Sequence, residues 1–337
     1  MKRIVVGLLA VVLACTALSG CAATQLVTGK EESVTAQEAV VTRIAALKGP
    51  TAMGIVKMLE DDKEAESPRY DAALYTAADE IVPLIGKGEV DIALVPTNLA
   101  ATLYKKTEGG VAVIDVNAGD VLYGVSNEEN SFYSVSQLKG KVLYMTGKGT
   151  TPEWSLRYLL SQNEMTMNDL TVEFKSEPTE IVSLLTQNPD AVAILPQPFA
   201  TVAVQQNDSL RLSYSMSDEW QMYSDQSIQA GTATGVTIVR RTFLEKHPEA
   251  VKQFIEAHKA SVDYMRDNPE EGANLIEAYG ISKAEACVSL LKYHTPLIAV
   301  AGEKMKAWVQ EYLEHLYEIA PEAVGGEMPD DAFYYVG

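Results

Sequence analysis

Short apolar segments alternate with amphipathic segments along most of the chain. Apolar segments of about four to eight residues are typical of strands, and apolar residues spaced by three or four are typical of helices. In the first third, the pattern predicts strands over residues 42–47, 70–75, 90–95 and 111–115, and helices over 52–59, 81–85 and 99–106. Apolar strands separated by helices indicate a parallel sheet covered on both faces. We therefore expect an α/β fold.

The same pattern begins again near residue 137. It predicts strands over residues 142–145, 171–174, 191–195 and 235–239, and helices over 154–160 and 179–185. Helices then dominate, over residues 248–267, 272–279, 283–293 and 303–319. The first of these is amphipathic, and its apolar side is formed by Val251, Phe254, Ile255, His258, Val262 and Met265. Two α/β lobes followed by a helical segment are expected.

One short phrase occurs in both halves, between a predicted strand and a predicted helix. The first copy is Lys48-Gly49-Pro50-Thr51 and the second is Lys148-Gly149-Thr150-Thr151. Free N–H groups at a helix start, a threonine hydroxyl and the positive end of the helix suit an anion or a carbonyl-rich small molecule. Each copy can also be a purely structural corner, and neither has nucleotide-loop spacing. Together they favour one ligand held between two lobes.

Ligands of open α/β sheets bind beyond the carboxyl ends of the strands. Thr76, Thr97 and Asn98 follow strands of the first half, and Gln197 follows a strand of the second. The candidate ligand-binding residues are therefore Gly49, Pro50, Thr51, Ala52, Thr76, Thr97, Asn98, Asn117, Gly147, Lys148, Gly149, Thr150, Thr151 and Gln197. Both ligand contact and a purely structural role stay open for four side chains: Lys48, Lys148, Trp154 and Trp220.

The chain begins with the pattern of a secreted lipoprotein. A basic head precedes the apolar residues 4–17, which are too few to span a bilayer comfortably. Leu18-Ser19-Gly20-Cys21 resembles the bacterial lipobox, which implies cleavage before Cys21 and a lipid on its sulfur. We expect residues 1–20 to be the signal peptide, residues 21–38 a flexible tether, and the protein to be held outside the bacterial cell membrane.

Charge and cysteine content narrow the possible functions. The formal net charge is -19, from 46 acidic and 27 basic side chains. Nucleic acid would be repelled by most of this surface and is excluded as a partner. A small anionic ligand is not excluded, because salt screens remote surface charges. Once Cys15 is removed and Cys21 is lipidated, only Cys287 remains, so the mature chain has no intrachain disulfide.

The sequence contains no strong catalytic or metal-binding pattern. His247, His258, His294 and His315 occur singly, and no pair has metal-ligand spacing. Cys287 lies in an apolar predicted helix and is expected to be an inert core residue. No Gly-x-Ser-x-Gly elbow is present. We predict no catalytic residue, no metal and no cofactor.

Several segments resemble, in their order and spacing, the substrate-binding lipoproteins of ABC importers in the nitrate/sulfonate/taurine and thiamine-precursor (NMT1/THI5-like) branch. They are the lipobox, the strand that ends in Gly49-Pro50-Thr51, and residues 87–93, 137–142 and 196–200. The resemblance implies a bilobal type II periplasmic-binding-protein fold, with two α/β lobes joined by two crossing strands and the ligand between them. It also implies a monomer that is not an enzyme and serves a membrane permease with its ATPase.

The resemblance also suggests lobe boundaries and solutes. Residues 39–120 and 236–337 are expected to form the first lobe and residues 121–235 the second, with crossing strands near 117–125 and 234–239. The paired helix starts favour a nitrate-, sulfonate- or taurine-like anion, whereas the thiamine-precursor relatives imply a neutral heterocycle as the alternative. Two other classes stay open, namely an enzyme on the same bilobal fold and a surface sensor or adhesin.

Overall fold

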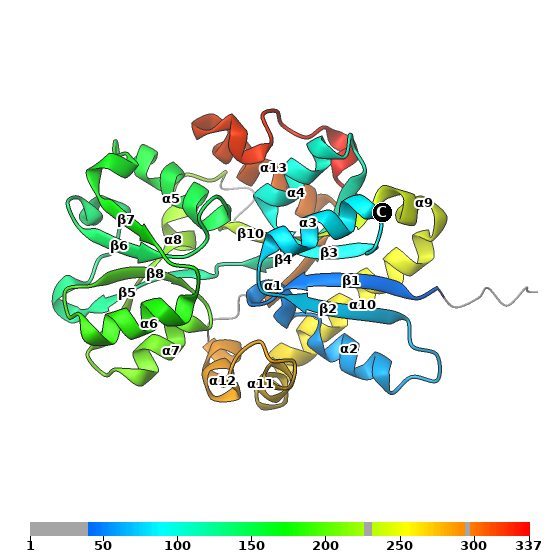
Figure 1. Cartoon of the computed structure of the whole chain (residues 1–337), viewed down its shortest axis with the longest axis horizontal. Helices are drawn as coiled ribbons and strands as arrows, with labels where there is room; N and C mark the ends of the chain where they lie inside the picture. The colour runs from blue at the N-terminus through cyan, green and yellow to red at the C-terminus, as the bar shows by residue number, and fades with distance from the viewer. Residues whose placement is uncertain (1–39, 226–230, 294–296) are drawn as a thin grey trace, which may run out of the picture. The chain divides into compact units, whose positions relative to one another are not determined.

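Two mixed β-sheets organise the part of the chain that the structure describes (Figure 1). The structure is a computed structural model, and it describes residues 40–225, 231–293 and 297–337. The predicted signal peptide, Cys21, the tether and His294 lie outside the described residues. The described residues form one compact unit, and both sheets belong to it.

The first sheet contains six described strands in the order β11-β4-β10-β3-β1-β2. They are β1 (Thr42–Leu47), β2 (Tyr70–Tyr75), β3 (Ile92–Pro96), β4 (Val111–Gly119), β10 (Ala233–Arg240) and β11 (Leu297–Ala301). β1 is parallel to β2 and β3, but β10 lies antiparallel between β3 and β4. The prediction of a fully parallel sheet is therefore wrong here, because the chain returns from the second sheet in the opposite direction and separates β3 from β4.

The second sheet repeats this plan, with five described strands in the order β7-β6-β8-β5-β9. They are β5 (Leu122–Asn127), β6 (Val142–Met145), β7 (Thr171–Phe174), β8 (Val192–Pro196) and β9 (Leu210–Ser215). β6 is parallel to β7 and β8, whereas β5 is antiparallel to β8 and β9. The sequence pattern predicts β6, β7 and β8 but misses β9, where Arg211 and Ser213 interrupt the apolar residues.

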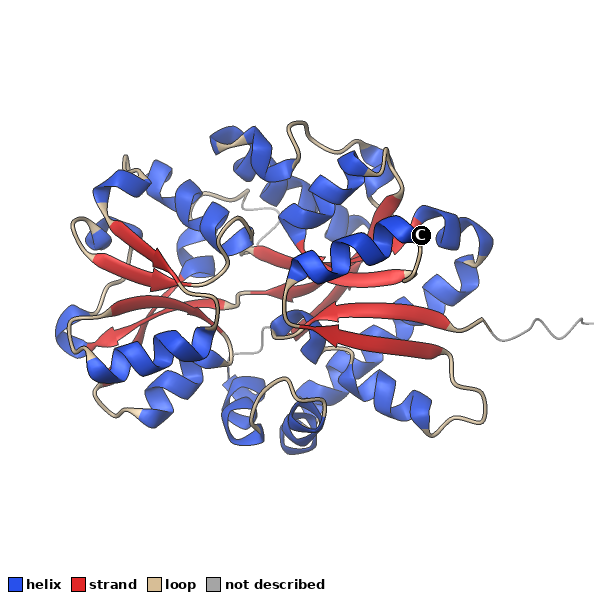
Figure 2. Cartoon of the chain, viewed as in Figure 1, coloured by secondary structure: helices blue, strands red, loops and turns tan. Residues whose placement is uncertain are grey.

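Helices pack around both sheets (Figure 2). We call the first sheet with its helices the first lobe; these helices are α1 (Pro50–Met53), α2 (Val56–Lys63), α3 (Ala78–Lys87), α4 (Thr97–Lys106), α9 (Arg241–Lys246), α10 (Pro248–Asp267), α11 (Pro269–Ala278), α12 (Ala284–Tyr293) and α13 (Gly302–Ile319). The second lobe has α5 (Thr151–Gln162), α6 (Pro178–Gln187), α7 (Phe199–Gln206) and α8 (Met216–Gln221). Five 3-10 helices complete the described elements: η1 (Glu128–Asn130), η2 (Val135–Leu138), η3 (Met167–Asp169), η4 (Pro321–Val324) and η5 (Asp331–Phe333).

A break after Met53 divides the helix predicted over residues 52–59 into α1 and α2. The chain packs closely on α10 at this point: a Cβ at Gly54 would lie 2.8 Å from Nε2 of His258. His258 is fully buried, and its Nδ1 lies 2.9 Å from Oδ2 of Asp115. The prediction that His258 belongs to the buried apolar side of α10 is confirmed. α1 is left with only four residues.

Alternate residues of β1 contribute to different apolar clusters of the first lobe. Ile44 and Ala46 pack in the cluster that contains Phe254 of α10, whereas Ala45 packs in the cluster that contains Leu313 of α13. This alternation follows from the two-residue repeat of a strand, and burial of both faces stabilises a central strand. Among the described helices, none has the length and apolar character needed to cross a membrane.

Candidate ligand-binding site

The first predicted corner lies between β1 and α1. Gly49 has φ 113, a backbone conformation that side chains disfavour, so this corner requires glycine. Thr51 is 8% exposed, and its hydroxyl donates to the carbonyl oxygen of Leu47 at 2.6 Å. The N–H groups of Ala52 and Met53 bond to the carbonyl oxygen of Gly49. The four residues of α1 therefore provide few free donors and little helix dipole.

The second corner lies between β6 and α5, and its polar groups bond within the chain. The N–H and the hydroxyl of Thr150 both donate to the carbonyl oxygen of Gly147. The N–H of Gly149 donates to Oε2 of Glu153 at 2.8 Å. The prediction of a cluster of free donors at this helix start is therefore wrong for Gly149 and Thr150, because the chain supplies its own acceptors.

The second corner bonds to residues of α4 and β10 of the first lobe. Nδ2 of Asn98, at the start of α4, donates to the carbonyl oxygen of Gly149 at 3.3 Å. The hydroxyl of Thr151 donates to the carbonyl oxygen of Thr234 at 3.1 Å. Both bonds join the first lobe to the second. The structure thus places the predicted rims of the two lobes against each other.

Three predicted residues carry buried side-chain atoms without a hydrogen-bond partner among the described residues. These atoms are Oδ1 of Asn98, Oδ1 of Asn117 and Nε2 of Gln197. The three residues are 5%, 0% and 0% exposed, so these atoms are shielded from bulk solvent. Buried polar atoms normally have partners, and unpartnered ones are unusual enough to require an explanation. A bound solute with complementary groups would provide one.

The orientation of two of these amides follows from their neighbours. Nδ2 of Asn98 faces the carbonyl oxygens of Gly149 and Ala323, which only accept, so the unpartnered atom is the oxygen. Oε1 of Gln197 accepts from the N–H and the hydroxyl of Thr201, so its unpartnered atom is the nitrogen. Nδ2 of Asn117 bonds to the hydroxyl oxygen of Thr237 at 3.1 Å. The site offers both an acceptor and a donor.

Gly235 on β10 is a site residue that the sequence patterns did not single out. A Cβ on Gly235 would lie 2.5 Å from Cγ2 of Thr51 and 2.6 Å from Oδ1 of Asn117. Thr51, Asn117 and Gly235 are therefore in close contact. Glycine inside a strand often marks a close approach of another group, and that signal was available in the sequence.

Other predicted residues either bond within the chain or are exposed. Thr76 is exposed, and its hydroxyl donates to Glu80 in the first turn of α3. Thr97 is fully buried, and its hydroxyl donates to the carbonyl oxygen of Ala233 at 2.6 Å. Lys48 and Lys148 are exposed. Pro50, at the start of α1, is half-buried, Ala52 is buried, and Gly147 has φ 83.

The two tryptophans left open by the sequence differ in environment. Trp220 on α8 is 1% exposed and packs between Tyr158 and Tyr312, with ring centroids 4.5 and 4.8 Å away, so it is a core residue. Trp154 is half-buried, and its indole N–H donates to the carbonyl oxygen of Gly149 at 3.2 Å. Trp154 therefore supports the second corner.

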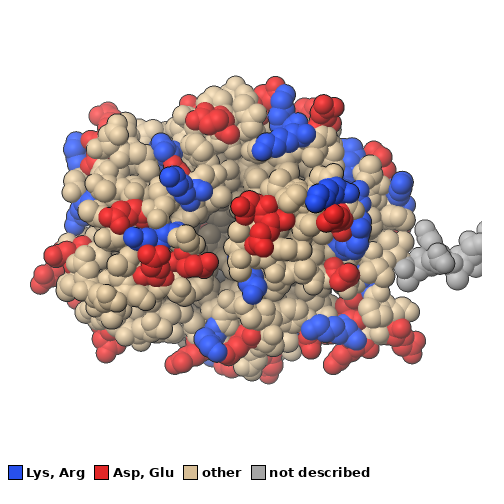
Figure 3. Space-filling model, viewed as in Figure 1, with Lys and Arg blue, Asp and Glu red and all other residues tan. Residues whose placement is uncertain are grey.

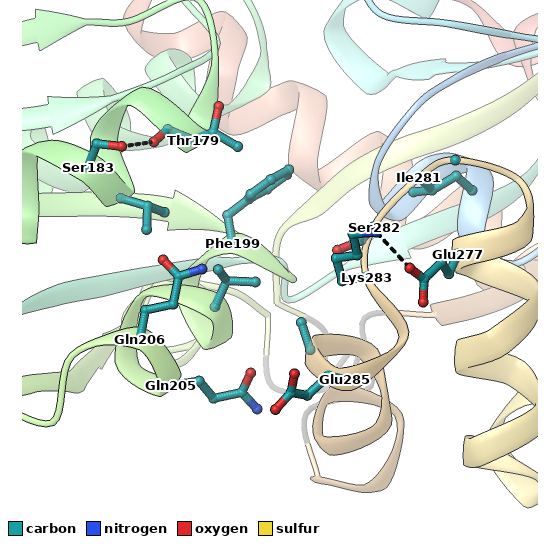
Figure 4. Close-up of a pocket in the computed structure, with 14 residues that line it drawn as sticks. Thr179, Ser183, Phe199, Gln205, Gln206, Glu277, Ile281, Ser282, Lys283 and Glu285 are labelled. Carbon is teal, nitrogen blue, oxygen red and sulfur yellow. Dashed lines mark hydrogen bonds and ion pairs between the residues drawn. The ribbon is translucent and has the colours of Figure 1, made fainter.

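A cavity of about 720 Å³ lies between α6 and α7 of the second lobe and the α11–α12 segment of the first (Figure 4). Phe199 projects into it, and Gln205 and Glu285 face each other across it. This volume is typical of small-molecule sites. The predicted ligand-binding residues do not line it, although Gln197 lies two residues before Phe199. Figure 3 shows the surface hollowed between the lobes, with acidic side chains on both sides.

The titratable side chains of the described residues do not form a metal-binding site. Within residues 40–225, 231–293 and 297–337, no group of three or more His, Cys, Asp or Glu is arranged to hold a metal ion. Cys287 is fully buried, and burial raises the pKa of its thiol to about 11. The thiol is therefore protonated at neutral pH and is a core group, as predicted.

This arrangement of strands is the periplasmic-binding-protein fold, which confirms the predicted fold class. One similar solved structure is an ABC transporter protein from Parabacteroides distasonis. The two sequences are 24% identical, the match covers 88% of this chain and 99% of that chain, and the TM-score is 0.74. The periplasmic aliphatic sulphonate binding protein SsuA of Escherichia coli matches with 15% identity, 88% and 92% coverage, and a TM-score of 0.69. The periplasmic nitrate-binding protein NrtA of Synechocystis PCC 6803 matches with 13% identity, 85% and 84% coverage, and a TM-score of 0.62.

The family follows from the sequence itself. Residues 71–272, more than half of the chain, match the family described as NMT1/THI5 like, and the chain belongs to this family. The predicted membership of the NMT1/THI5-like branch is thereby confirmed. No curated protein sequence matches the chain.

Proposed function

We propose that the protein is an extracytoplasmic solute-binding protein of an ABC importer, which captures a small solute between its two lobes and delivers it to a membrane permease with its ATPase. Membership of the NMT1/THI5 like family and the fold shared with ABC-transporter binding proteins support this class. The protein binds and releases its solute without chemical change. It acts as a monomer.

The observation that carries the proposal is the set of unpartnered amides at the strand ends. Asn98 follows β3, Asn117 lies on β4, and Gln197 follows β8, so both lobes contribute. All three residues are buried. Polar groups of this kind fix the orientation of a small molecule, and ligands of open α/β sheets bind at this edge.

Closure of the lobes couples capture to delivery. The bonds from Asn98 to Gly149 and from Thr151 to Thr234 already join the two lobes. A solute that also contacts groups of both lobes binds the closed form more tightly than the open form, and so shifts the population towards closure. The permease then recognises the closed form.

The sulphonate- and nitrate-binding neighbours support the anionic class of solute predicted from the sequence. The unpartnered amides suit a neutral heterocycle equally well. A thermal-shift screen of sulfonates, nitrate, carboxylates and pyrimidines, followed by calorimetry, separates the two classes. We expect at least one solute to raise the melting temperature and to be recovered unchanged. A product formed from that solute would instead support an enzyme.

A variant pair locates the solute. Asn117→Ala is expected to weaken binding about tenfold or more, because a buried hydrogen-bond group is lost. Asn168→Ala, in an exposed 3-10 helix, should leave affinity unchanged. Equal affinities of the two variants would place the solute elsewhere.

The lipid anchor is proposed from the sequence. The anchor can be tested in a bacterial host by labelling with a fatty-acid analogue and by membrane fractionation. Cys21→Ala should abolish labelling and release the protein from the membrane, whereas Cys15→Ala should change neither. Labelling that survives Cys21→Ala would contradict the anchor.

A further inference from the structure

The start of α5 holds a carboxylate of the chain itself. Oε2 of Glu153 accepts the N–H of Gly149 at 2.8 Å, and Oε1 accepts Nε and Nη2 of Arg157 at 2.8 and 2.6 Å. The Glu153 side chain is only 7% exposed, whereas that of Arg157 is 39% exposed. A buried carboxylate of the chain itself thus lies in the first turn of α5, where the helix dipole favours negative charge.

The other polar groups of this corner are also engaged. The carbonyl oxygen of Gly149 accepts from Nδ2 of Asn98 and from the indole N–H of Trp154. The guanidinium of Arg157 lies 5.4 Å from the Trp154 ring centroid while it bonds to Glu153. The guanidinium nitrogens nearest the corner are therefore directed at a carboxylate that belongs to the protein.

A second anion brought to this corner would meet the Glu153 carboxylate. Like charges a few ångströms apart repel in a poorly solvated site, and salt screens such a buried pair only weakly. Arg157, which pairs with Oε1 of Glu153, reduces this repulsion. Asn98, which bonds to this corner through Nδ2, has an unpartnered Oδ1, and Gln197, which follows β8 of the same lobe as α5, has an unpartnered Nε2. The Asn98 oxygen can accept a hydrogen bond and the Gln197 nitrogen can donate one, and neither amide carries a net charge.

We propose that Glu153 determines solute specificity by excluding an anionic group from the second-lobe side of the site. This inference rests on the proposed solute-binding function and deepens it. The part of the solute that faces α5 is uncharged, and it carries an N–H or O–H donor for Asn98 and an acceptor for Gln197.

Matched pairs of probes that differ in charge but little in shape test this role. They are methanesulfonate with methanesulfonamide, acetate with acetamide, and benzoate with benzamide, titrated by calorimetry into the full-length protein at constant ionic strength. The wild-type protein should bind the uncharged member of a pair about tenfold more tightly. Glu153→Gln should bring the two affinities together, mainly by improved binding of the acid.

Two further variants keep the test valid if Glu153→Gln folds poorly. Glu153→Asp keeps the charge and should keep the wild-type preference. Arg157→Met leaves the carboxylate uncompensated and should increase the preference for uncharged probes. Glu164→Gln, which removes an exposed carboxylate of the same lobe, is the matched control and should behave as wild type.

The outcomes separate this inference from the function on which it rests. The role of Glu153 alone is overturned if the wild-type protein binds the acids more tightly than the amides. It is also overturned if the preference is the same in the wild type, Glu153→Gln and Arg157→Met. Absence of binding for every probe and every solute of the thermal-shift screen counts against the solute-binding function itself.

Discussion

Gly235 permits the closest approach between strand β10 and the first corner. Its missing side chain leaves space for Cγ2 of Thr51 and Oδ1 of Asn117, which lie 2.5 and 2.6 Å from where a Cβ would be. Thr51 is fixed by its bond to Leu47, and Asn117 by its bond to Thr237. Neither side chain can therefore move away without the loss of a buried hydrogen bond.

Gly235→Ala is expected to destabilise the fold by about 1–3 kcal/mol, the usual cost of overpacking. It should also weaken solute binding, because the methyl group displaces Thr51 or Asn117. Denaturant unfolding and calorimetry measure the two effects. Gly86→Ala is the control, since nothing lies within 4 Å of its Cβ position and alanine favours the helix α3. Equal stability of the two variants would show that β10 tolerates the methyl group.

At this scale the sequence did not predict the interactions of the corner residues. Asn98, Asn117 and Gln197 were predicted as site residues, and the structure gives each a buried unpartnered atom. The donors of Gly149 and Thr150 were predicted to be free, but they bond to Glu153 and Gly147. A pattern shows that a helix starts at a corner, whereas the acceptor of each N–H depends on side-chain orientations that no pattern contains.

Among the elements, strands β1, β3 and β10 are joined at one end by the carboxylate of Asp91. Arg43 on β1 donates to Asp91 from its backbone N–H, Nε and Nη2, and Arg240 on β10 donates from Nη2 at 2.6 Å. The Asp91 side chain is 3% exposed, whereas that of Arg43 is 41% exposed. Burial raises the pKa of Asp91, but the hydrogen bonds from Arg43 and Arg240 outweigh burial and lower it below 3.8.

Asp91→Asn is expected to lower the free energy of unfolding by about 2–3 kcal/mol at neutral pH. This is less than the ~3–5 kcal/mol for a fully buried pair, because Arg43 is partly in water. Because folding lowers the Asp91 pKa, its stabilisation is present above pH 3.8 and is lost as pH falls through the folded pKa. Denaturant unfolding from pH 7 to 3 should therefore show wild type and variant converging only at the acidic end.

The control for this prediction is an ion pair of the helix surface. Asp61 pairs with Lys57 on α2 and is largely exposed, so Asp61→Asn should cost no more than about 0.5 kcal/mol. A pH-independent difference between Asp91→Asn and the wild type would show that the carboxylate charge is not what joins the three strands.

Elements were predicted well where periodicity alone determines them. β1, β2, β6 and β7 occupy their predicted residues, and α10 buries its predicted apolar side. The direction of β10 was not predicted, because its apolar residues fit a parallel and an antiparallel neighbour equally. The division of α1 from α2 lies where Gly54 packs closely against His258, a residue far away in the sequence, so no local pattern could predict it.

At the scale of the whole molecule, α13 connects the lobes. Its Tyr312 hydroxyl bonds to Oγ of Ser155 on α5 at 2.6 Å, and both groups are buried. The Tyr312 ring packs on Trp220 of α8, while Leu313 and Val309 belong to the apolar cluster that includes β4. The C-terminal helix therefore stabilises one arrangement of the two lobes, which the sequence could not show because α13 follows both lobes in the chain.

The bond between Ser155 and Tyr312 should show strong coupling in a double-mutant cycle. Tyr312→Phe and Ser155→Ala should each lower the free energy of unfolding by about 1–3 kcal/mol, because each leaves a buried hydroxyl unpartnered. The double variant should lose clearly less than the sum of the two, since both unpartnered groups are then gone. Tyr317→Phe, on the more exposed side of the same helix, is the matched control and should change stability by less than about 0.5 kcal/mol. Additive losses, measured by denaturant unfolding, would mean that α13 holds the second lobe through its aromatic contacts alone.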